Sequence, residues 1–322
     1  MKQTNFFLHI SKIILFSGIL VATASARAEL KVVTTIKPLH SLISNVMDGV
    51  GEPGLIIDGS ISPHSFTMKP SHAKMLEEAD VIFWIGEGIE TSMEEPLDSI
   101  AKDAEVIEFM ELDSIAKLKF REESIFGDHD DHDDHDDHDD HDDHDDHAGH
   151  EGHNHGEFDA HIWLDPSNAK EMVHEIAHEL GDLDPANKDK YEANAEATIK
   201  ALDQLISDVG TDINSDAKFV VFHDAYQYFE ERFGVRAAGA LTLNTDVLPG
   251  AKQIADIQDV IKDKGIKCIF SEPQFNPKII TTIAEDMNIK TGVFDPLGAN
   301  IDSGKSLYFK LISNLGNELK GC

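Results

Sequence analysis

The chain is poor in cysteine, in aromatic residues and in positive charge. Its 322 residues include two cysteines and two tryptophans, and 27 lysines and arginines stand against 61 aspartates and glutamates, giving a formal net charge of -34. This imbalance excludes a nucleic-acid-binding protein, because no basic face could offset so much negative charge. The 41% hydrophobic content still suffices for real cores, and the length allows one large domain or two of ordinary size.

The chain also lacks a hydrophobic run long enough to span a bilayer. Its most apolar stretch, residues 13–22, is shorter than the roughly 20 residues that a membrane-spanning helix needs. Lysines precede this stretch, and Ala26-Arg27-Ala28 follows it with the small-x-small pattern of a signal-peptidase site. We therefore expect residues 1–28 to be a cleaved signal peptide. Because no cysteine follows the apolar stretch, we expect no lipid anchor and a periplasmic protein.

The two cysteines, Cys268 and Cys322, are expected to form a disulfide, because two cysteines in an exported chain usually pair. The chain-entropy model gives such a bond about 4 kcal/mol of stabilisation. It would also hold the C-terminus in place. The alternative is two free thiols acting as soft metal ligands, which an oxidising compartment disfavours.

Histidine, in contrast, is abundant and concentrated in one tract. From Asp128 the sequence repeats Asp-Asp-His as far as His147 and continues with glycine and histidine to His155. Imidazole and carboxylate together suit zinc, and a repeat offers many weak sites. A solvated acidic spacer is the alternative, but acidity alone would not require a histidine at every third position. We expect auxiliary, weak zinc binding by His129, His132, His135, His138, His141, His144, His147, His150, His153 and His155.

Outside this tract, apolar strand-like runs alternate with helical patterns. We expect strands at residues 30–36, 54–58, 81–85, 106–109, 218–222, 268–270 and 291–294. We expect helices at residues 38–47, 71–79, 186–213, 224–233, 249–264, 277–287 and 303–319, with Ser71 as the N-cap of the second. Such alternation predicts an α/β fold with mostly parallel sheets.

The domain organisation follows from the one long polar helix. We expect an N-terminal α/β lobe at residues 29–184, a rigid connecting helix at 185–213 and a similar C-terminal α/β lobe at 214–322. The first lobe would carry a disordered insertion at about residues 121–158, where like charges bury nothing. Two facing lobes create a cleft, the usual place for a ligand.

Four polar residues follow expected strands or lie in loops that would face this cleft. They are His64, His161, His223 and Asp295. In open α/β sheets, ligands gather at the carboxyl ends of the strands. Three imidazoles with a carboxylate or a water form a tetrahedral site suited to zinc. We therefore expect these residues to form a metal site between the lobes.

With these motifs the chain resembles the metal-binding solute receptors of ABC importers, and most closely their zinc-uptake, ZnuA-type branch. The likeness covers nearly everything after residue 28. It is carried by Pro63-His64, Lys69-Pro70-Ser71, the histidine-rich insertion, His161-Ile162-Trp163-Leu164-Asp165-Pro166, Phe222-His223-Asp224-Ala225-Tyr226, Ser271-Glu272-Pro273-Gln274 and Asp295-Pro296-Leu297-Gly298.

The resemblance implies a function and a ligand set. It implies a periplasmic receptor that binds Zn²⁺ tightly through His64, His161 and His223 and delivers it to an ABC permease with a separate ATPase subunit. Asp295 or a water would be the fourth ligand, since Pro63 stands where some zinc receptors have glutamate. Cys268 and Cys322 match the disulfide of the zinc branch. The receptor would be a monomer and no enzyme.

Three other functions compete with this one. A manganese or iron receptor of the same family commonly has glutamate at the position of His223, and a harder oxygen ligand favours a harder ion. A zinc metallopeptidase would use His174-Glu175-Ile176-Ala177-His178, which matches H-E-x-x-H. The apolar stripe of that segment leaves both histidines at its polar flank, as expected for solvated residues. A zinc buffer or adhesin would need only the tract.

Overall fold

The computed structural model of the chain describes residues 30–126, 157–243, 245 and 249–322. The expected signal peptide and the ten histidines of the tract lie outside these residues. Among the helices of the described part, none is long and apolar enough to cross a membrane.

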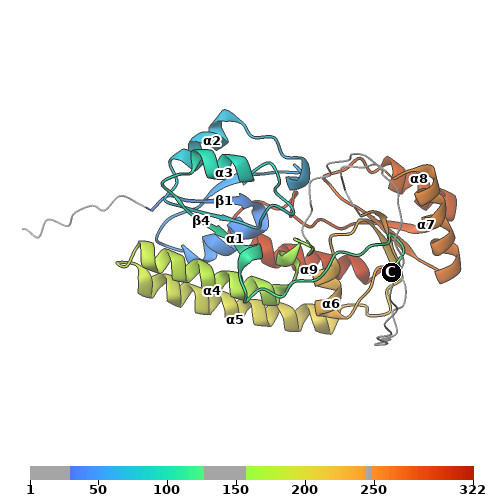
Figure 1. Cartoon of the computed structure of the whole chain (residues 1–322). Coiled ribbons are helices and arrows are strands. Elements are labelled where there is room, and N and C mark those ends of the chain that lie inside the picture. Colours follow the sequence, from blue (N-terminus) through green and yellow to red (C-terminus); the bar gives the residue numbers. More distant parts are fainter. Residues whose placement is uncertain (1–29, 127–156, 244, 246–248) are drawn as a thin grey trace, which may run out of the picture.

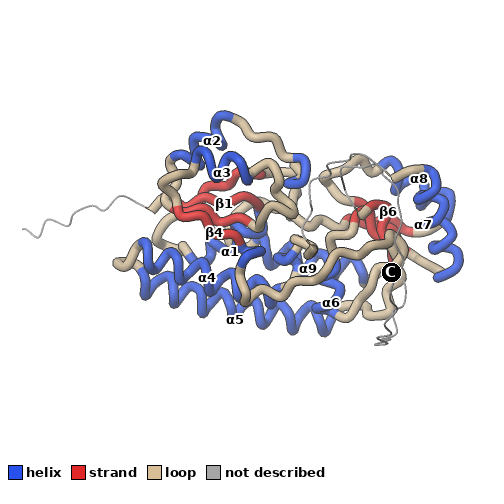
Figure 2. Tube along the Cα trace, in the orientation of Figure 1, coloured by secondary structure: helices blue, strands red, loops and turns tan. Residues whose placement is uncertain are grey.

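The described residues form two four-stranded sheets of the same topology (Figures 1 and 2). The first has the order β2-β1-β3-β4 and the second the order β6-β5-β7-β8, with every neighbouring pair parallel. The strands are β1 (Val32–Ile36), β2 (Gly54–Ile57), β3 (Val81–Trp84), β4 (Glu105–Glu108), β5 (Phe219–His223), β6 (Ala240–Thr242), β7 (Cys268–Ser271) and β8 (Lys290–Val293). The predicted pair of parallel α/β lobes is confirmed.

Helices flank these sheets and connect them (Figure 1). They are α1 (Lys37–Val46), α2 (Pro70–Glu77), α3 (Glu94–Ile100), α4 (Pro166–Leu183), α5 (Lys188–Asp212), α6 (Gln227–Phe233), α7 (Ala251–Lys264), α8 (Lys278–Met287) and α9 (Leu307–Leu319). The predicted N-cap Ser71 is wrong: α2 begins at Pro70 with Lys69 as its N-cap, so Ser71 is inside the helix. Proline suits the first turn because the amide hydrogen that it lacks has no intrahelical partner there. Helices α6 and α9 begin three and four residues later than predicted, at Gln227 and Leu307.

Both faces of the second sheet are buried at its inner strands β5 and β7, as expected of a parallel sheet. Successive side chains of a strand point to opposite faces. In β5, Phe219 and Val221 therefore join the large core shared with α9, whereas Val220 and Phe222 join a separate core beneath α7 and α8. The run is uniformly apolar up to its last residue, His223, which is buried at the carboxyl end.

The long helix α5 is one of several elements that connect the lobes. It packs against α4 along its length, against α1 of the first lobe and against α9, the last helix of the chain. Helix α9 also packs directly on α1. The first lobe is therefore held by α5 and by α9 together.

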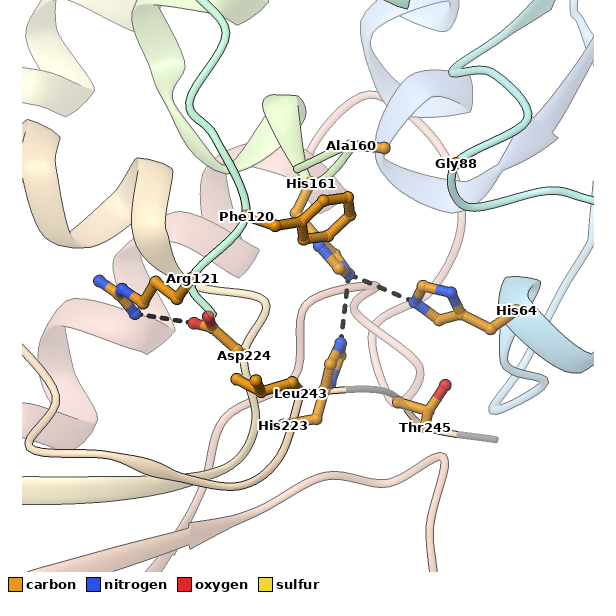
Figure 3. Close-up of a pocket in the computed structure, with 10 residues that line it drawn as sticks. All are labelled: His64, Gly88, Phe120, Arg121, Ala160, His161, His223, Asp224, Leu243 and Thr245. Carbon is orange, nitrogen blue, oxygen red and sulfur yellow. Dashed lines mark hydrogen bonds and ion pairs between the residues drawn. The ribbon is translucent and has the colours of Figure 1, made fainter. Parts of the chain in front are cut away.

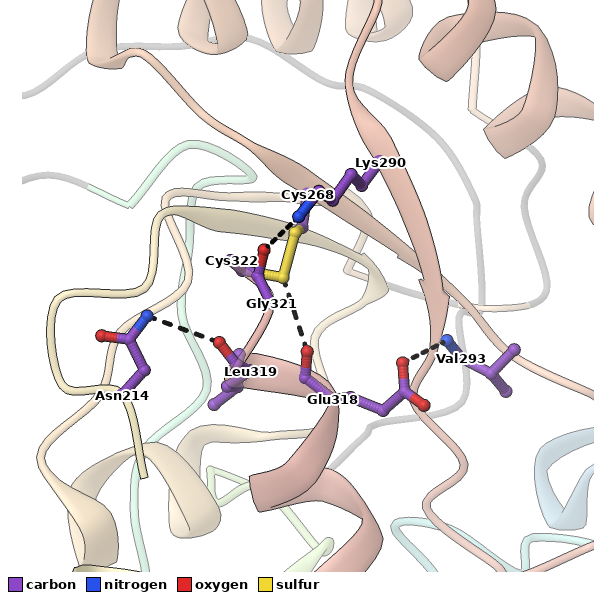
Figure 4. Close-up of a disulfide and its surroundings, with 8 residues drawn as sticks. All are labelled: Asn214, Cys268, Lys290, Val293, Glu318, Leu319, Gly321 and Cys322. Carbon is purple, nitrogen blue, oxygen red and sulfur yellow. Dashed lines mark hydrogen bonds between the residues drawn. A yellow bond between two sulfur atoms is a disulfide. The ribbon is translucent and has the colours of Figure 1, made fainter. Parts of the chain in front are cut away.

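The end of α9 is fixed to the second sheet by a disulfide between Cys268, which begins β7, and Cys322 (Figure 4). Lys290 Nζ donates to the carbonyl of Gly321 at 2.7 Å, and Glu318 accepts from the amide of Val293. The predicted pairing is confirmed, and both cysteines are thereby removed as metal ligands.

Candidate metal centre

Three histidines that are far apart in the sequence meet between the two sheets (Figure 3). His64 lies in a short 3₁₀ turn, Pro63–Ser65, after β2. His161 lies directly before a second such turn, Ile162–Leu164, that leads into α4. His223 is the last residue of β5. Each therefore comes from a different segment, and His161 and His223 are almost completely buried.

The Nε2 atoms of these side chains converge on one point. His161 Nε2 is 3.2 Å from His223 Nε2 and 3.4 Å from His64 Nε2. Two nitrogens bound to one tetrahedral zinc ion at about 2.05 Å would be separated by about 3.3 Å. Within the described part of the chain, these residues form the only group of three or more potential ligands with this proximity.

Buried carboxylates behind two of the imidazoles determine which nitrogen faces the centre. Asp159 Oδ1 lies 2.7 Å from His161 Nδ1, and both oxygens of Glu272 lie within 3.0 Å of His223 Nδ1. Each Nδ1–H therefore donates to a carboxylate, which leaves the Nε2 lone pairs facing one another. Two lone pairs 3.2 Å apart repel unless a proton or a metal ion lies between them. With His64 beside them, the three histidines form a group that could hold a metal ion.

Asp159 is itself held in place by further contacts. Its Oδ1 accepts from the backbone amide of His161, and its Oδ2 accepts from Gln227 Nε2 at 3.1 Å. Tyr228 donates its hydroxyl to the Asp159 carbonyl at 2.6 Å. Since Gln227 and Tyr228 belong to α6, the second lobe supports a ligand that precedes α4. Neither Asp159 nor Glu272 was predicted, although Glu272 follows a strand end, where such supporting groups occur.

The protonation of the two buried histidines is coupled. Burial, and to a smaller extent the neighbouring His223, lowers the pKa of His161 well below its usual value. Burial alone would lower the pKa of His223 too, but the charge and hydrogen bond of Glu272, together with the charges of Asp224 and Asp159, outweigh it and raise the pKa. Burial likewise raises the pKa of Asp159 to about 7. Of the two histidines, His223 is therefore the one that takes up a proton. A metal ion that binds there must displace this proton.

The surroundings of the cluster differ on its two sides. One side opens into a cavity of about 190 Å³, lined by the histidines together with Gly88, Phe120, Arg121, Ala160, Asp224, Leu243 and Thr245. The other side is nearly filled, with a cavity of about 10 Å³ against Trp163, Glu272, Phe275 and their neighbours. Among the described residues, the larger cavity therefore leaves more room for a fourth ligand from solvent.

Asp295, the fourth predicted ligand, is not part of the converging group. Its Oδ1 instead accepts from Gln274 Nε2 at 3.1 Å and from the backbone amide of Leu297 at 3.2 Å. These bonds hold the loop that follows β8. The geometry thus brings three of the four predicted residues together.

The H-E-x-x-H segment lies elsewhere, on α4. His174 and His178 are exposed, and the closest charged partner of His178 is Asp182 at 4.0 Å. No third ligand joins them within the described residues. The apolar stripe of this helix, which includes Met172, Val173 and Ile176, is fully buried, as its periodicity predicts.

Comparisons with known proteins agree over almost the whole chain. The family model of ZnuA, the periplasmic component A of a zinc-uptake complex, matches residues 32–322. The high-affinity zinc uptake system protein ZnuA of Brucella abortus is 48% identical over 303 residues, covering 90% of this chain and 91% of that protein. Its namesake from Yersinia pestis is 32% identical over 310 residues, covering 96% of each. A crystal structure of ZnuA shares the fold, with a TM-score of 0.70, 23% identity, and coverage of 90% of this chain and 98% of that one.

Proposed function

Because the chain belongs to the ZnuA family of periplasmic zinc-uptake components, we propose that it is a receptor that binds one zinc ion tightly between its lobes and delivers it to an ABC permease. His64, His161 and His223 are the proposed ligands, each through Nε2. The observation that carries this proposal is that the ligand nitrogens of three histidines lie within 4.8 Å of one another. Two of the Nε2–Nε2 distances, 3.2 and 3.4 Å, match the spacing of a tetrahedral zinc site. A water from the larger cavity would complete the coordination.

The chemistry of the three ligands favours zinc over manganese. All three are borderline nitrogen donors, whereas manganese prefers carboxylate and water oxygens. Asp159 and Glu272 increase the basicity of His161 and His223 and fix their orientation, as acidic partners of zinc-bound histidines do. Copper would compete by ligand strength alone, so discrimination against copper depends on its availability.

The remaining parts of the proposal concern the partners and the compartment. The relatives are named for zinc uptake, and the family resemblance adds a membrane permease with a separate ATPase. We place the protein in the periplasm as a monomer, released by cleavage after residue 28. Its lobes would be residues 29–184 and 214–322, with 185–213 as the connector and the histidine tract as a weak auxiliary zinc binder. The protein itself would catalyse no reaction.

The test is a titration of the metal-stripped mature protein with zinc and, separately, with manganese. We expect one zinc equivalent to bind far more tightly than any other, and to compete successfully against excess manganese. His161→Ala should remove this equivalent and leave only weak binding. A variant that retains the tight equivalent would overturn the proposed ligand set.

Exposed histidines on α4 provide the matched control. His174→Ala combined with His178→Ala removes two imidazoles without touching the converging group. This double variant should bind zinc as the unchanged protein does. Loss of the tight equivalent in the double variant would instead favour a metal site on α4.

A further inference from the structure

The segment that leads towards the histidine tract is packed beside the metal centre. We name residues 118–126 the arm. Although we expected the insertion to lack structure from about residue 121, the amide of Phe126 donates to the Ala238 carbonyl at 3.1 Å, and Ser124 accepts from the amide of Ala240 at 2.8 Å. Ile125 and Gly239 form an antiparallel bridge. The arm therefore leaves the first lobe and lies along β6 of the second.

Close packing between the arm and the second lobe depends on one glycine. A Cβ atom at Gly239 would lie 2.7 Å from the carbonyl oxygen of Ser124, which is closer than real Cβ contacts. The arm begins at an equally well-defined contact, since the Leu118 amide donates to Tyr228 of α6 at 2.9 Å. Both ends of the arm are thus attached to the second lobe.

Between these ends, Arg121 joins the arm to two buried carboxylates. Its guanidinium donates to Asp224 Oδ1 at 2.7 Å (Figure 3). It also donates to Glu230 Oε2 at 2.5 Å, and its Cζ lies 4.0 Å from the ring centre of Phe126. The side chains of Asp224 and Glu230 are almost fully buried. Since burial disfavours their charged forms, the guanidinium between them stabilises both carboxylates.

Arg121 thereby positions its neighbour in the sequence. Phe120 lines the 190 Å³ cavity with the three histidines, and Asp224 directly follows His223 in the chain (Figure 3). The two hydrogen bonds of Arg121 fix the backbone that carries the Phe120 ring. This ring forms an apolar part of the wall of the larger of the two cavities that the described residues leave beside the cluster. A ligand that removes a bound ion through this cavity passes the ring.

We propose that Arg121 is a positioning residue of the zinc site, which holds Phe120 over the cavity and so slows the release of the bound ion. This inference rests on the proposed function. Arg121 touches neither the ion nor its ligands. Its effect is on exchange: with the arm released, water and competing ligands reach the fourth coordination position more often.

The experiment measures zinc dissociation from the full mature chain loaded with one equivalent, after mixing with excess chelator. Arg121→Gln and Phe120→Ala should each release zinc roughly 10- to 100-fold faster, the range seen when groups that support metal ligands are removed. Arg121→Lys keeps the charge without the two-pronged geometry and should fall between them and the unchanged protein. Thermal unfolding of the zinc-free variants separates this effect from lost stability.

Arg232 is the matched control, because it too forms a two-pronged pair, with Asp165 at 2.6 and 2.8 Å, and neither partner lines the cavity. Arg232→Gln should release zinc at the unchanged rate. The proposal is overturned if Phe120→Ala also keeps that rate, or if Arg121→Gln is no faster than Arg232→Gln. If Arg121→Gln does not fold, the zinc dissociation rates of Phe120→Ala and Arg121→Lys test the proposal instead. Failure of the proposed zinc-receptor function would look different from failure of the Arg121 proposal. In that case even the protein without substitutions would release zinc quickly.

Discussion

The two lobes have the same strand order but use the ends of their first strands differently. Lys37 directly follows β1, whereas His223 is the last residue of β5. Both side chains are buried. Lys37 Nζ donates to the carbonyls of Gly298 and Ile301 at 2.9 and 2.7 Å and so fastens the first lobe to the second. One strand end thus holds the lobes together, and the other presents a metal ligand.

The next strand of each sheet repeats this contrast. After β7, Glu272 accepts from His223 and orients a ligand. After β3, Glu90 is also fully buried, but its Oε2 accepts from the backbone amides of Ile85 and Gly86. An acidic side chain behind a strand end therefore supports the site in one lobe and a backbone turn in the other. The shared topology therefore places side chains at the strand ends of both lobes, and the residue at each end determines whether it supports the metal site or the fold.

The largest effect is expected from His223→Ala. Loss of a ligand should reduce zinc affinity by more than the roughly 100-fold that removing a supporting group costs at most. Competition against a chelating dye measures this change. Lys37→Met provides the comparison, because it alters a buried side chain at the corresponding strand end of the other lobe and should retain the tight site. Equal losses in both variants would contradict the assignment of roles.

Glu272→Gln should have the next largest effect. The amide can no longer act as a charged acceptor for the Nδ1–H of His223, so zinc affinity should fall by roughly 10- to 100-fold. The same dye competition, run beside Glu90→Gln, tests whether the two buried glutamates differ as proposed. If Glu90→Gln weakens zinc binding as much, the support is not specific to the second lobe.

Lys37→Met should lower the free energy of unfolding of the zinc-free protein by about 2 kcal/mol, because buried carbonyls lose a charged donor. Urea denaturation measures this value. Lys305, which pairs with Asp48 at 2.8 Å on the exposed surface, is the control. Lys305→Met should change the stability by no more than about 0.5 kcal/mol. A similar loss in both variants would mean that burial of Lys37 contributes little.

The smallest effect concerns pH. Burial raises the pKa of Glu90 to about 7, from 4.5 in the absence of the fold. Between these values the folded state holds a proton that the unfolded state has released, so this residue makes stability fall as the pH rises. From about pH 5.5 to 6.5, the zinc-free protein should therefore lose about 1 kcal/mol more than Glu90→Gln does. Identical pH profiles in urea denaturation would rule out the raised pKa.

The sequence was sufficient to predict what depends on strong local patterns. Alternating apolar runs indicated the parallel sheets, and the histidines were identified by motifs that follow strand ends. Strand β6, with three residues, gave no comparable pattern and was missed. So was α3, whose seven residues bury one apolar side chain, Leu97.

What the sequence could not indicate depends on contacts between distant segments. Asp159 lies close to the end of the acidic tract, and nothing in the local sequence distinguishes it from the many aspartates of the tract. Its support from Gln227 is visible only after α6 is placed beside it. Arg121 likewise fell within the expected insertion, and its two partners follow it by more than a hundred residues.

The central claim is that one tight zinc site exists in the cleft independently of the histidine tract. The most direct measurement is a calorimetric zinc titration of metal-stripped protein lacking residues 128–155, with and without His161→Ala. The account predicts that the shortened protein keeps one tight site and that His161→Ala removes it. If deletion of the tract alone abolishes all binding, the cleft site is wrong and the protein is a surface metal buffer.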